Sequence, residues 1–346
     1  MDFSLIFFSG DEHNKYRLVL DAARFADAHR FEAIWIPERH FHRFGGLYPN
    51  PSVLGAALAM VTKRLKIRAG SVVLPLHDPV RVAEEWSVVD NLSGGRVGIA
   101  LATGFSPIDF VFRPENWSKR RDVTFGAVEI LRSLWEGSSL FLRDGAGNNV
   151  EIELHPSPLQ ERLPLWLTCT KSTETFVKAG ELGCGVLTGL VDMGVEELGR
   201  KIAIYRRTLE VNGHEPTEHR VSLMMHAFVG DDINRVKEIV REPFLAYLKS
   251  FLTVIDSQKQ SLTPGQGVRD MAPGDREALL EFGFDKFFGN AALMGTVESC
   301  SRVVERIRSA GVDEIACLID FGVDDELVME SLDRLDVLRR RYAEEG

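Results

Sequence analysis

The 346-residue sequence predicts an α/β protein whose single domain, residues 1–346, folds as a (β/α)8 TIM barrel. The first observation is that eight apolar, strand-like runs are separated by helical patterns along nearly the whole chain. The second is that this alternation implies parallel strands covered by helices. An open doubly wound sheet is the alternative, and it is weaker because no GxGxxG motif follows an early strand.

The stretch 71–96 contains one such unit. A buried apolar run over 65–74 is followed by Pro79, which suits the first turn of a helix because its missing N–H would have no partner there. Two glycines at 94–95 end this helix before the next apolar run. Apolar side chains recur between them at helical spacing, at Val82, Trp86, Val89 and Leu92.

The other elements follow from the same two periodicities. Strands are expected at 3–8, 33–36, 65–74, 97–102, 165–168, 185–187, 221–229 and 314–319. Helices are expected at 16–29, 53–61, 79–92, 123–135, 173–182, 195–211, from 233 onward, 297–310 and 327–342.

Two segments interrupt the alternation. Residues 137–158 carry glycines and asparagines between two short strand-like pieces, which predicts an inserted hairpin. Residues 257–275 are rich in Gln, Ser, Gly and Pro, and a loop this long inside a compact domain is usually functional or disordered. We expect it to form a mobile lid over the barrel mouth.

Composition excludes several classes of function. The net charge is −10 and the only basic block is Arg339–Arg341, which argues against nucleic-acid binding. None of the four cysteines has CxxC spacing, so no metal site is expected. The N-terminus does not resemble a signal peptide, and no apolar run approaches the roughly 18–20 residues needed to span a membrane. We therefore expect a cytoplasmic protein.

Three segments together resemble the bacterial luciferase-like flavin monooxygenases. They are WIPERHFHRFGGLYPN at 35–50, the stretch 71–96, and DEIACLIDFG at 313–322. Within that superfamily, residues 45–55 and 90–96 are most similar to the monooxygenases of polyketide and nonribosomal peptide biosynthesis.

The resemblance implies a two-component enzyme that uses reduced FMN, supplied by a flavin reductase, together with molecular oxygen. The implied reaction hydroxylates a natural-product intermediate or inserts oxygen into it, and this substrate is a small molecule or is bound to a carrier protein. A homodimer built around the helix at 80–92 is also implied. Two alternatives stay open: a deazaflavin-dependent dehydrogenase of the same superfamily, and a non-catalytic homologue that binds flavin or a partner.

The candidates for catalysis follow the second strand, where barrel active sites lie. They are Glu38, Arg39, His40 and His42. A histidine can act as an acid or base near neutral pH, and luciferase has its catalytic histidine where this chain has Arg39. The alternative is structural: Glu38 and Arg39 form an ion pair and His40 caps a loop.

The resemblance also places flavin contacts at the ends of the third and fourth strands. The Gly70–Ser71 peptide matches a position that can be a non-proline cis bond beneath the flavin, and the alternative is a plain strand end. Thr103 and Gly104 would border the flavin edge, although luciferase has an arginine in place of Thr103.

The turn after the fifth strand is the expected phosphate site. Its candidates are Cys169, Thr170, Lys171 and Thr173, since a helix N-terminus with free N–H groups binds anions. Relatives tend to have glycine where this chain has Lys171. In the alternative interpretation, Ser172 only caps the helix. Gly189, after the sixth strand, departs from the histidine that relatives carry and leaves the substrate side open.

Overall fold

Eight parallel strands close into a barrel in the computed structural model, which describes residues 1–8, 16–190, 193–262 and 271–343. The last barrel strand pairs with the first, so the sheet has no open edge among these strands. In barrel order they are β1 (Asp2–Ile6), β2 (Ala33–Ile36), β3 (Lys66–Val73), β4 (Val97–Ala102), β7 (Leu165–Thr168), β8 (Gly185–Gly189), β9 (Val221–Gly230) and β11 (Glu314–Leu318).

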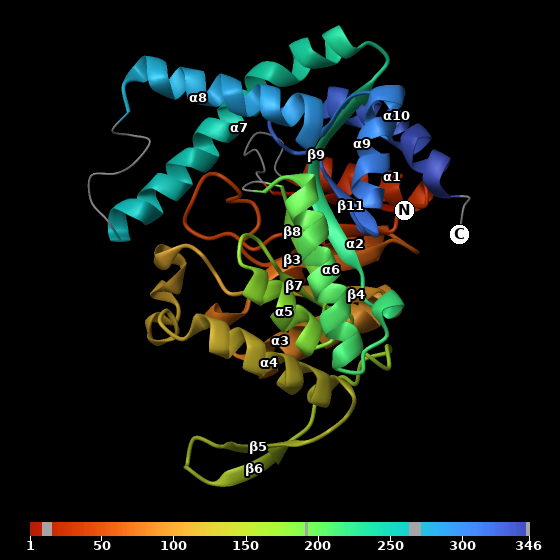
Figure 1. Cartoon of the computed structure of the whole chain (residues 1–346). Helices are drawn as coiled ribbons and strands as arrows, with labels where there is room; N and C mark the ends of the chain where they lie inside the picture. The colour runs from red at the N-terminus through yellow and green to blue at the C-terminus, as the bar shows by residue number, and fades with distance from the viewer. Residues whose placement is uncertain (9–15, 191–192, 263–270, 344–346) are drawn as a thin grey trace.

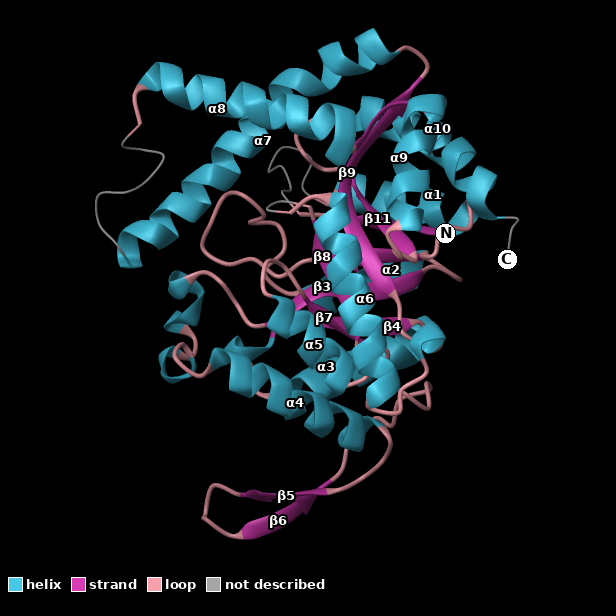
Figure 2. Ribbon diagram, in the orientation of Figure 1, coloured by secondary structure: helices cyan, strands magenta, loops and turns pink. Residues whose placement is uncertain are grey.

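Helices surround these strands (Figures 1 and 2). They are α1 (Arg17–Ala28), α2 (Pro51–Val61), α3 (Pro79–Ser93), α4 (Arg120–Trp135), α5 (Thr173–Glu181), α6 (Val195–Val211), α7 (Ile233–Leu262), α8 (Pro273–Lys286), α9 (Val297–Ser309) and α10 (Asp325–Ala343). The predicted (β/α)8 barrel is thus confirmed, with each expected strand within a few residues of its place. Within the described ranges, no helix combines the length and apolarity needed to cross a bilayer.

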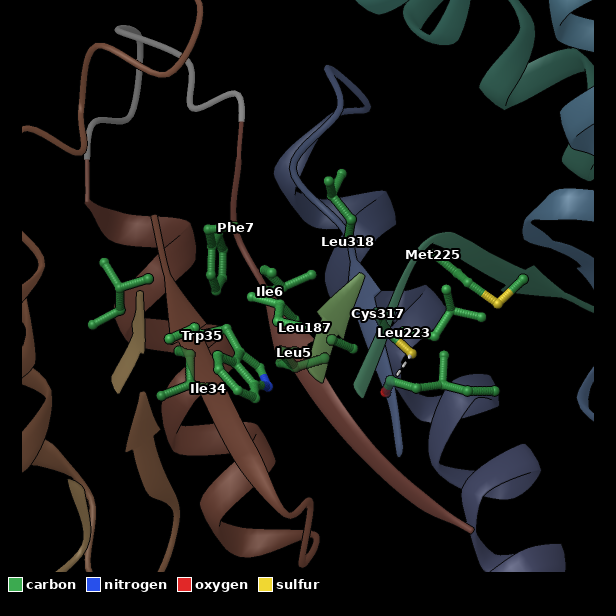
Figure 3. Close-up of a cluster of buried hydrophobic side chains, with 14 of the residues drawn as sticks. Leu5, Ile6, Phe7, Ile34, Trp35, Leu187, Leu223, Met225, Cys317 and Leu318 are labelled. Atoms are coloured by element: carbon green, nitrogen blue, oxygen red, sulfur yellow. Dashed lines mark hydrogen bonds between the residues drawn. The ribbon is translucent and has the colours of Figure 1, made fainter. Parts of the chain in front are cut away.

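The strands read as continuous apolar runs because both of their faces are buried. Leu5, Ile34, Trp35 and Leu187 are at most 4% exposed, and Figure 3 shows them converging with neighbours from β9 and β11. The strands are therefore packed on both of their faces, and the candidate site is sought at the C-terminal end of the barrel.

Two elements were not predicted. β10 (Leu293–Thr296) is only four residues long and pairs with the last residues of β9 outside the barrel order. Helix α8 begins at Pro273, inside the segment that was expected to be a loop. Residues 257–262 likewise belong to α7, so the expected loop over 257–275 is shorter at both ends. Residues 263–270 lie outside the described residues, and the lid stays a prediction.

Within 137–158, β5 (Leu140–Arg143) and β6 (Asn149–Ile152) pair antiparallel. This hairpin extends away from the barrel in Figure 1. None of its residues is among those that line the cavity described below.

A polar network fills the N-terminal end of the barrel interior. The Glu314 carboxylate, which is fully buried, accepts hydrogen bonds from Arg68 at 2.7 Å and from Trp35 Nε1 at 2.9 Å. Ser222 donates at 2.9 Å, and Ser4 also donates to it. Burial opposes ionisation of Glu314, but the Arg68 charge and these donors hold the pKa of its carboxyl below the usual range.

Candidate active site

A cavity of about 330 Å³ opens at the C-terminal ends of the barrel strands. Side chains from seven barrel strands, or from the loops directly after them, and from α7 form its wall. Much of this wall is apolar, including Ile6, Phe8, Val73, Ala102, Phe105, Leu187, Met193, Met224 and Phe251. The position agrees with the rule that active sites of such barrels lie at this end.

The cavity brings together eight of the twelve site residues predicted from sequence. Glu38, Arg39, Gly70, Ser71, Gly104, Cys169, Thr170 and Lys171 all line it. The other four, His40, His42, Thr103 and Thr173, are not among the lining residues. The C-terminal ends of β2, β3, β4 and β7 therefore meet at the cavity as expected, although the other four predicted residues do not line it.

Glu38 is the best-anchored polar group in the cavity wall. Its Oε1 accepts from His40 Nε2 at 2.8 Å and from His77 Nε2 at 2.5 Å, and its Oε2 accepts from the Val73 N–H at 2.6 Å. Burial opposes ionisation, but the two histidines outweigh it and keep the pKa of Glu38 below its usual range. The pKa of His77 is raised, because the bond to Glu38 outweighs the opposing effect of burial.

The two predicted histidines lie beside the cavity and not in its wall. His40 packs edge-on against Phe112, with ring centroids 5.0 Å apart, and contacts the cavity through Glu38. His42 is half-buried, and burial together with the Arg39 charge lowers the pKa of its imidazole. The alternative in which Glu38 pairs with Arg39 is not what the described residues show, since Glu38 pairs with histidines.

Arg39 lies in the cavity wall with its guanidinium stacked 3.8 Å from the Phe8 ring centroid. Burial lowers the pKa of this group to about 10, so it remains a cation at neutral pH. Its backbone N–H donates to the Tyr48 carbonyl at 2.8 Å, which fixes the loop after β2.

The Gly70–Ser71 peptide is cis and lies within β3, where the register with β4 shifts. Ser71 Oγ and Thr168 Oγ1 are hydrogen-bonded, joining the ends of β3 and β7 inside the barrel. A Cβ at Gly70 would come within 3.1–3.2 Å of Trp35, so the backbone here packs directly on that indole. This side-chain bond therefore links two strands that β4 separates in the sheet.

Gly104 adopts a φ of +76°, and a Cβ there would lie 2.9 Å from the Phe110 ring. Glycine is therefore required on both conformational and steric grounds. Thr103, the residue before it, is half-buried and does not line the cavity.

The turn from β7 into α5 closes the opposite side of the cavity. Ser172 occupies the N-cap position without a side-chain capping bond, so its hydroxyl is not used by the helix. The Lys201 ammonium group donates to the Lys171 carbonyl at 2.6 Å and holds the turn in place. Cys169 is fully buried and burial raises the pKa of its thiol, which makes it a wall residue and not a nucleophile.

A family model for luciferase-like monooxygenases matches residues 3–314 of this chain. The chain belongs to this family. The luciferase-like chain is 24% identical over 332 residues to the oxygenase component of a flavin-dependent trigonelline monooxygenase from Acinetobacter baylyi, covering 92% of this chain and 88% of the relative. It is 25% identical over 308 residues to 4-hydroxyprotoasukamycin monooxygenase from Streptomyces nodosus subsp. asukaensis, covering 84% and 76%.

The oxygenating constituent of 3,6-diketocamphane monooxygenase from Pseudomonas putida, solved in complex with FMN, has a similar fold. Its TM-score is 0.76 at 19% identity, covering 97% of this chain and 96% of the other. The family match makes this chain a luciferase-like monooxygenase, and the solved structure shows that the fold is shared.

Sequence reasoning missed two polar residues of the luciferase-like site. His77 joins Glu38 although the two lie 39 positions apart, and its place just before a proline-led helix gave no sign of the contact. Thr188 in β8 lines the cavity, and its buried hydroxyl has no partner among the residues that the structure describes. Its position at a strand end, two residues after a buried valine, was the available signal.

Proposed function

We propose that the protein is the oxygenase component of a two-component system that uses reduced FMN and molecular oxygen. It hydroxylates a natural-product intermediate or inserts oxygen into it, and this substrate is free or bound to a carrier protein. A separate flavin reductase supplies the reduced FMN. The observation that carries the proposal is one apolar cavity bordered by Glu38 and Arg39 on one side and by Thr170 and Lys171, just before α5, on the other.

The donor groups around α5 fit the phosphate of FMN. Thr170 and Lys171 line the cavity at the turn, and the hydroxyl of Ser172 is unused by the helix. Unpaired N–H groups at a helix N-terminus favour an anion, and a lysine adds a full positive charge. We assign phosphate binding to Thr170, Lys171 and Thr173, and ring contacts to Gly70, Ser71, Gly104 and Cys169.

The apolar wall fits the flavin ring and serves to exclude water. When bound, reduced FMN supplies the electrons that activate oxygen. The protein positions the flavin ring and excludes water from the cavity. Leu187, Met193 and Met224 surround the space from β8 to β9 and leave few polar groups for water to bind.

Glu38, His40 and His77 are suited to hold a proton beside the reaction. Glu38 faces the cavity, and His77, whose side chain is 34% exposed, links it to solvent. A histidine bonded to a carboxylate can exchange protons near neutral pH. We assign to these residues the delivery and removal of the proton that an oxygenation requires.

The phosphate assignment is tested by comparing the affinities for FMN and riboflavin, measured by fluorescence quenching. Replacing Lys171 by Met removes a charged contact to phosphate, so FMN affinity falls about tenfold or more while riboflavin affinity stays the same. Lys178→Met is the matched control, because Lys178 lies on α5 and pairs with Glu181 at 2.9 Å. Equal effects on both flavins would place the phosphate elsewhere.

The reaction is tested with a flavin reductase, FMN, NADH and ¹⁸O₂, offering candidate intermediates free and carrier-bound. Mass spectrometry should find one ¹⁸O atom in the product and none when reduced FMN is omitted. Substrate oxidation that needs a deazaflavin and no oxygen would instead support the dehydrogenase alternative.

We also propose a homodimer through α2 and α3. These helices pack on each other and expose Val53 and Met60 on α2 and Val88 and Leu92 on α3, each at least 44% exposed. Apolar side chains gathered in this way mark a protein interface. Sedimentation should give a dimer that Met60→Asp converts to monomer, whereas a wild-type monomer at micromolar concentration would contradict the proposal.

A further inference from the structure

Arg39 carries a buried charge that forms no ion pair with any residue in the described part of the chain. The residue is 9% exposed, and its guanidinium lies 3.8 Å from the Phe8 centroid and 5.5 Å from that of Phe105. Within the described part of the chain, no acceptor lies within hydrogen-bonding distance of its side chain and no carboxylate forms an ion pair with it. Asp109 and Asp320 act on it only through their charge.

This arrangement is unusual because buried charges in proteins are normally paired. The two neighbouring acids are committed elsewhere. Asp320 accepts from the Phe8 N–H at 2.9 Å and from Tyr48 Oη at 3.0 Å, and Asp109 is hydrogen-bonded to Ser106 while burial raises the pKa of its carboxyl. The N–H groups of Arg39 therefore remain available to a molecule in the cavity that it lines.

The cavity has a separate place for the phosphate of the cofactor. Arg39 follows β2, whereas the first turn of α5 follows β7, and β3 and β4 lie between them in the barrel order. Lys171 already provides a cation near that turn. A second cation, after a different strand, predicts a second anionic group.

We propose that Arg39 binds a carboxylate of the substrate, so that the enzyme acts on carboxylic acids with an otherwise apolar body. This inference rests on the proposed monooxygenase function. A planar guanidinium suits a carboxylate because two parallel hydrogen bonds can form between them. The apolar part follows from the neighbouring wall, where Val73, Phe105 and Phe251 offer no hydrogen bonds.

A negative charge on the reduced flavin ring is the other source of an anion at this position. The two sources predict different losses when Arg39 is replaced. If the substrate supplies the anion, carboxylate binding is lost and flavin affinity is kept. If the flavin supplies it, affinity for reduced FMN is lost and carboxylate binding is unaffected.

The experiment measures binding by calorimetry to protein saturated with oxidised FMN. The probes are aryl and alkyl carboxylates, such as benzoate and hexanoate, each paired with its neutral amide. Wild type should bind at least one acid more tightly than its amide, and Arg39→Met should weaken that acid by about tenfold or more, with the amide unchanged. Arg39→Lys should recover part of the loss, and the exposed Arg235→Met is the matched control.

Melting without ligand gives an independent readout. Removal of an unpaired buried charge should raise the melting temperature of Arg39→Met by about 2–4 °C, whereas a lower melting temperature would show that the protein itself satisfies the guanidinium. The proposal would also be overturned if the acids bind no better than their amides. The same holds if Arg39→Met weakens only the binding of reduced FMN. Because these assays need no turnover, a failed oxygenation test leaves their result intact.

Discussion

Each end of the barrel holds a buried charged group, and the two ends treat that group in opposite ways. At the N-terminal end, Glu314 is fully buried and four side chains donate to it, among them Arg68 and Ser222. At the C-terminal end, Arg39 and Thr188 are also buried, yet no hydrogen-bond partner reaches either side chain within the described ranges. Both ends use the same strands.

This difference separates stability from function. A buried charge with several donors stabilises the fold only as a complete set, and removal of one member leaves the others uncompensated. Unsatisfied groups lower stability but remain ready for a ligand. Glu38 lies between these cases, since its partners His40 and His77 hold it in place while it still faces the cavity.

The largest expected effect comes from breaking the polar network around Glu314 at the N-terminal end of the barrel. Arg68→Met leaves the Glu314 carboxylate buried without its cation, which should cost about 3–5 kcal/mol in the free energy of unfolding. Urea denaturation measures this loss. Arg81→Met is the control, because Arg81 is 66% exposed and its pairs with Glu84 and Glu85 should be worth less than about 1 kcal/mol. Similar losses in the two variants would show that the buried Glu314 carboxylate does not depend on the Arg68 charge.

A smaller effect is expected from two buried hydroxyls, one at each end. Ser222→Ala removes a donor to a buried carboxylate and should cost about 1.5–3 kcal/mol. Thr188→Val removes a hydroxyl that has no partner in the described part of the chain, so the free energy of unfolding should stay level or rise. Chemical denaturation of the two variants side by side tests this, and a marked loss in Thr188→Val would show an unrecognised partner.

The smallest effect concerns the pH dependence of the Glu38–His77 pair. The pKa of Glu38 is lowered from 4.5, so its contribution is lost as pH falls below that value. The pKa of His77 is raised from 6.5, so its contribution is complete below 6.5 and lost as pH rises through the folded-state value. The melting temperature difference between wild type and His77→Gln should therefore be largest between pH 4.5 and pH 6.5.

His155→Gln is the control for this series, since the His155 side chain is 75% exposed. Its melting temperature should differ from wild type by the same small amount at every pH. A His77→Gln difference that stays constant with pH would mean that the pair contributes only packing.

The sequence sufficed for the barrel and for the strand ends that meet around the cavity. Periodicity places Cα atoms, and residues such as Glu38 and Thr170 follow strands whose carboxyl ends must converge. It does not specify which way a side chain turns. His40 was expected in the site but packs against Phe112, and its contact with the cavity passes through Glu38.

Long-range partnerships were also beyond the sequence pattern. Neither the His77 contact with Glu38 nor the lack of a partner for Thr188 follows from local spacing, since each depends on the closed barrel. The short β10 and helix α8 were missed because a four-residue strand and a helix that opens with Pro273 and Gly274 give weak local signals.

We propose that the C-terminal end of this barrel holds FMN and an organic substrate. A crystal structure with FMN bound tests it most directly. We predict the phosphate at the first turn of α5, in contact with Thr170 and Lys171, and the ring against Gly70–Ser71, with the Arg39 guanidinium still unpaired. A phosphate bound to Arg39, or FMN outside this cavity, would contradict the account.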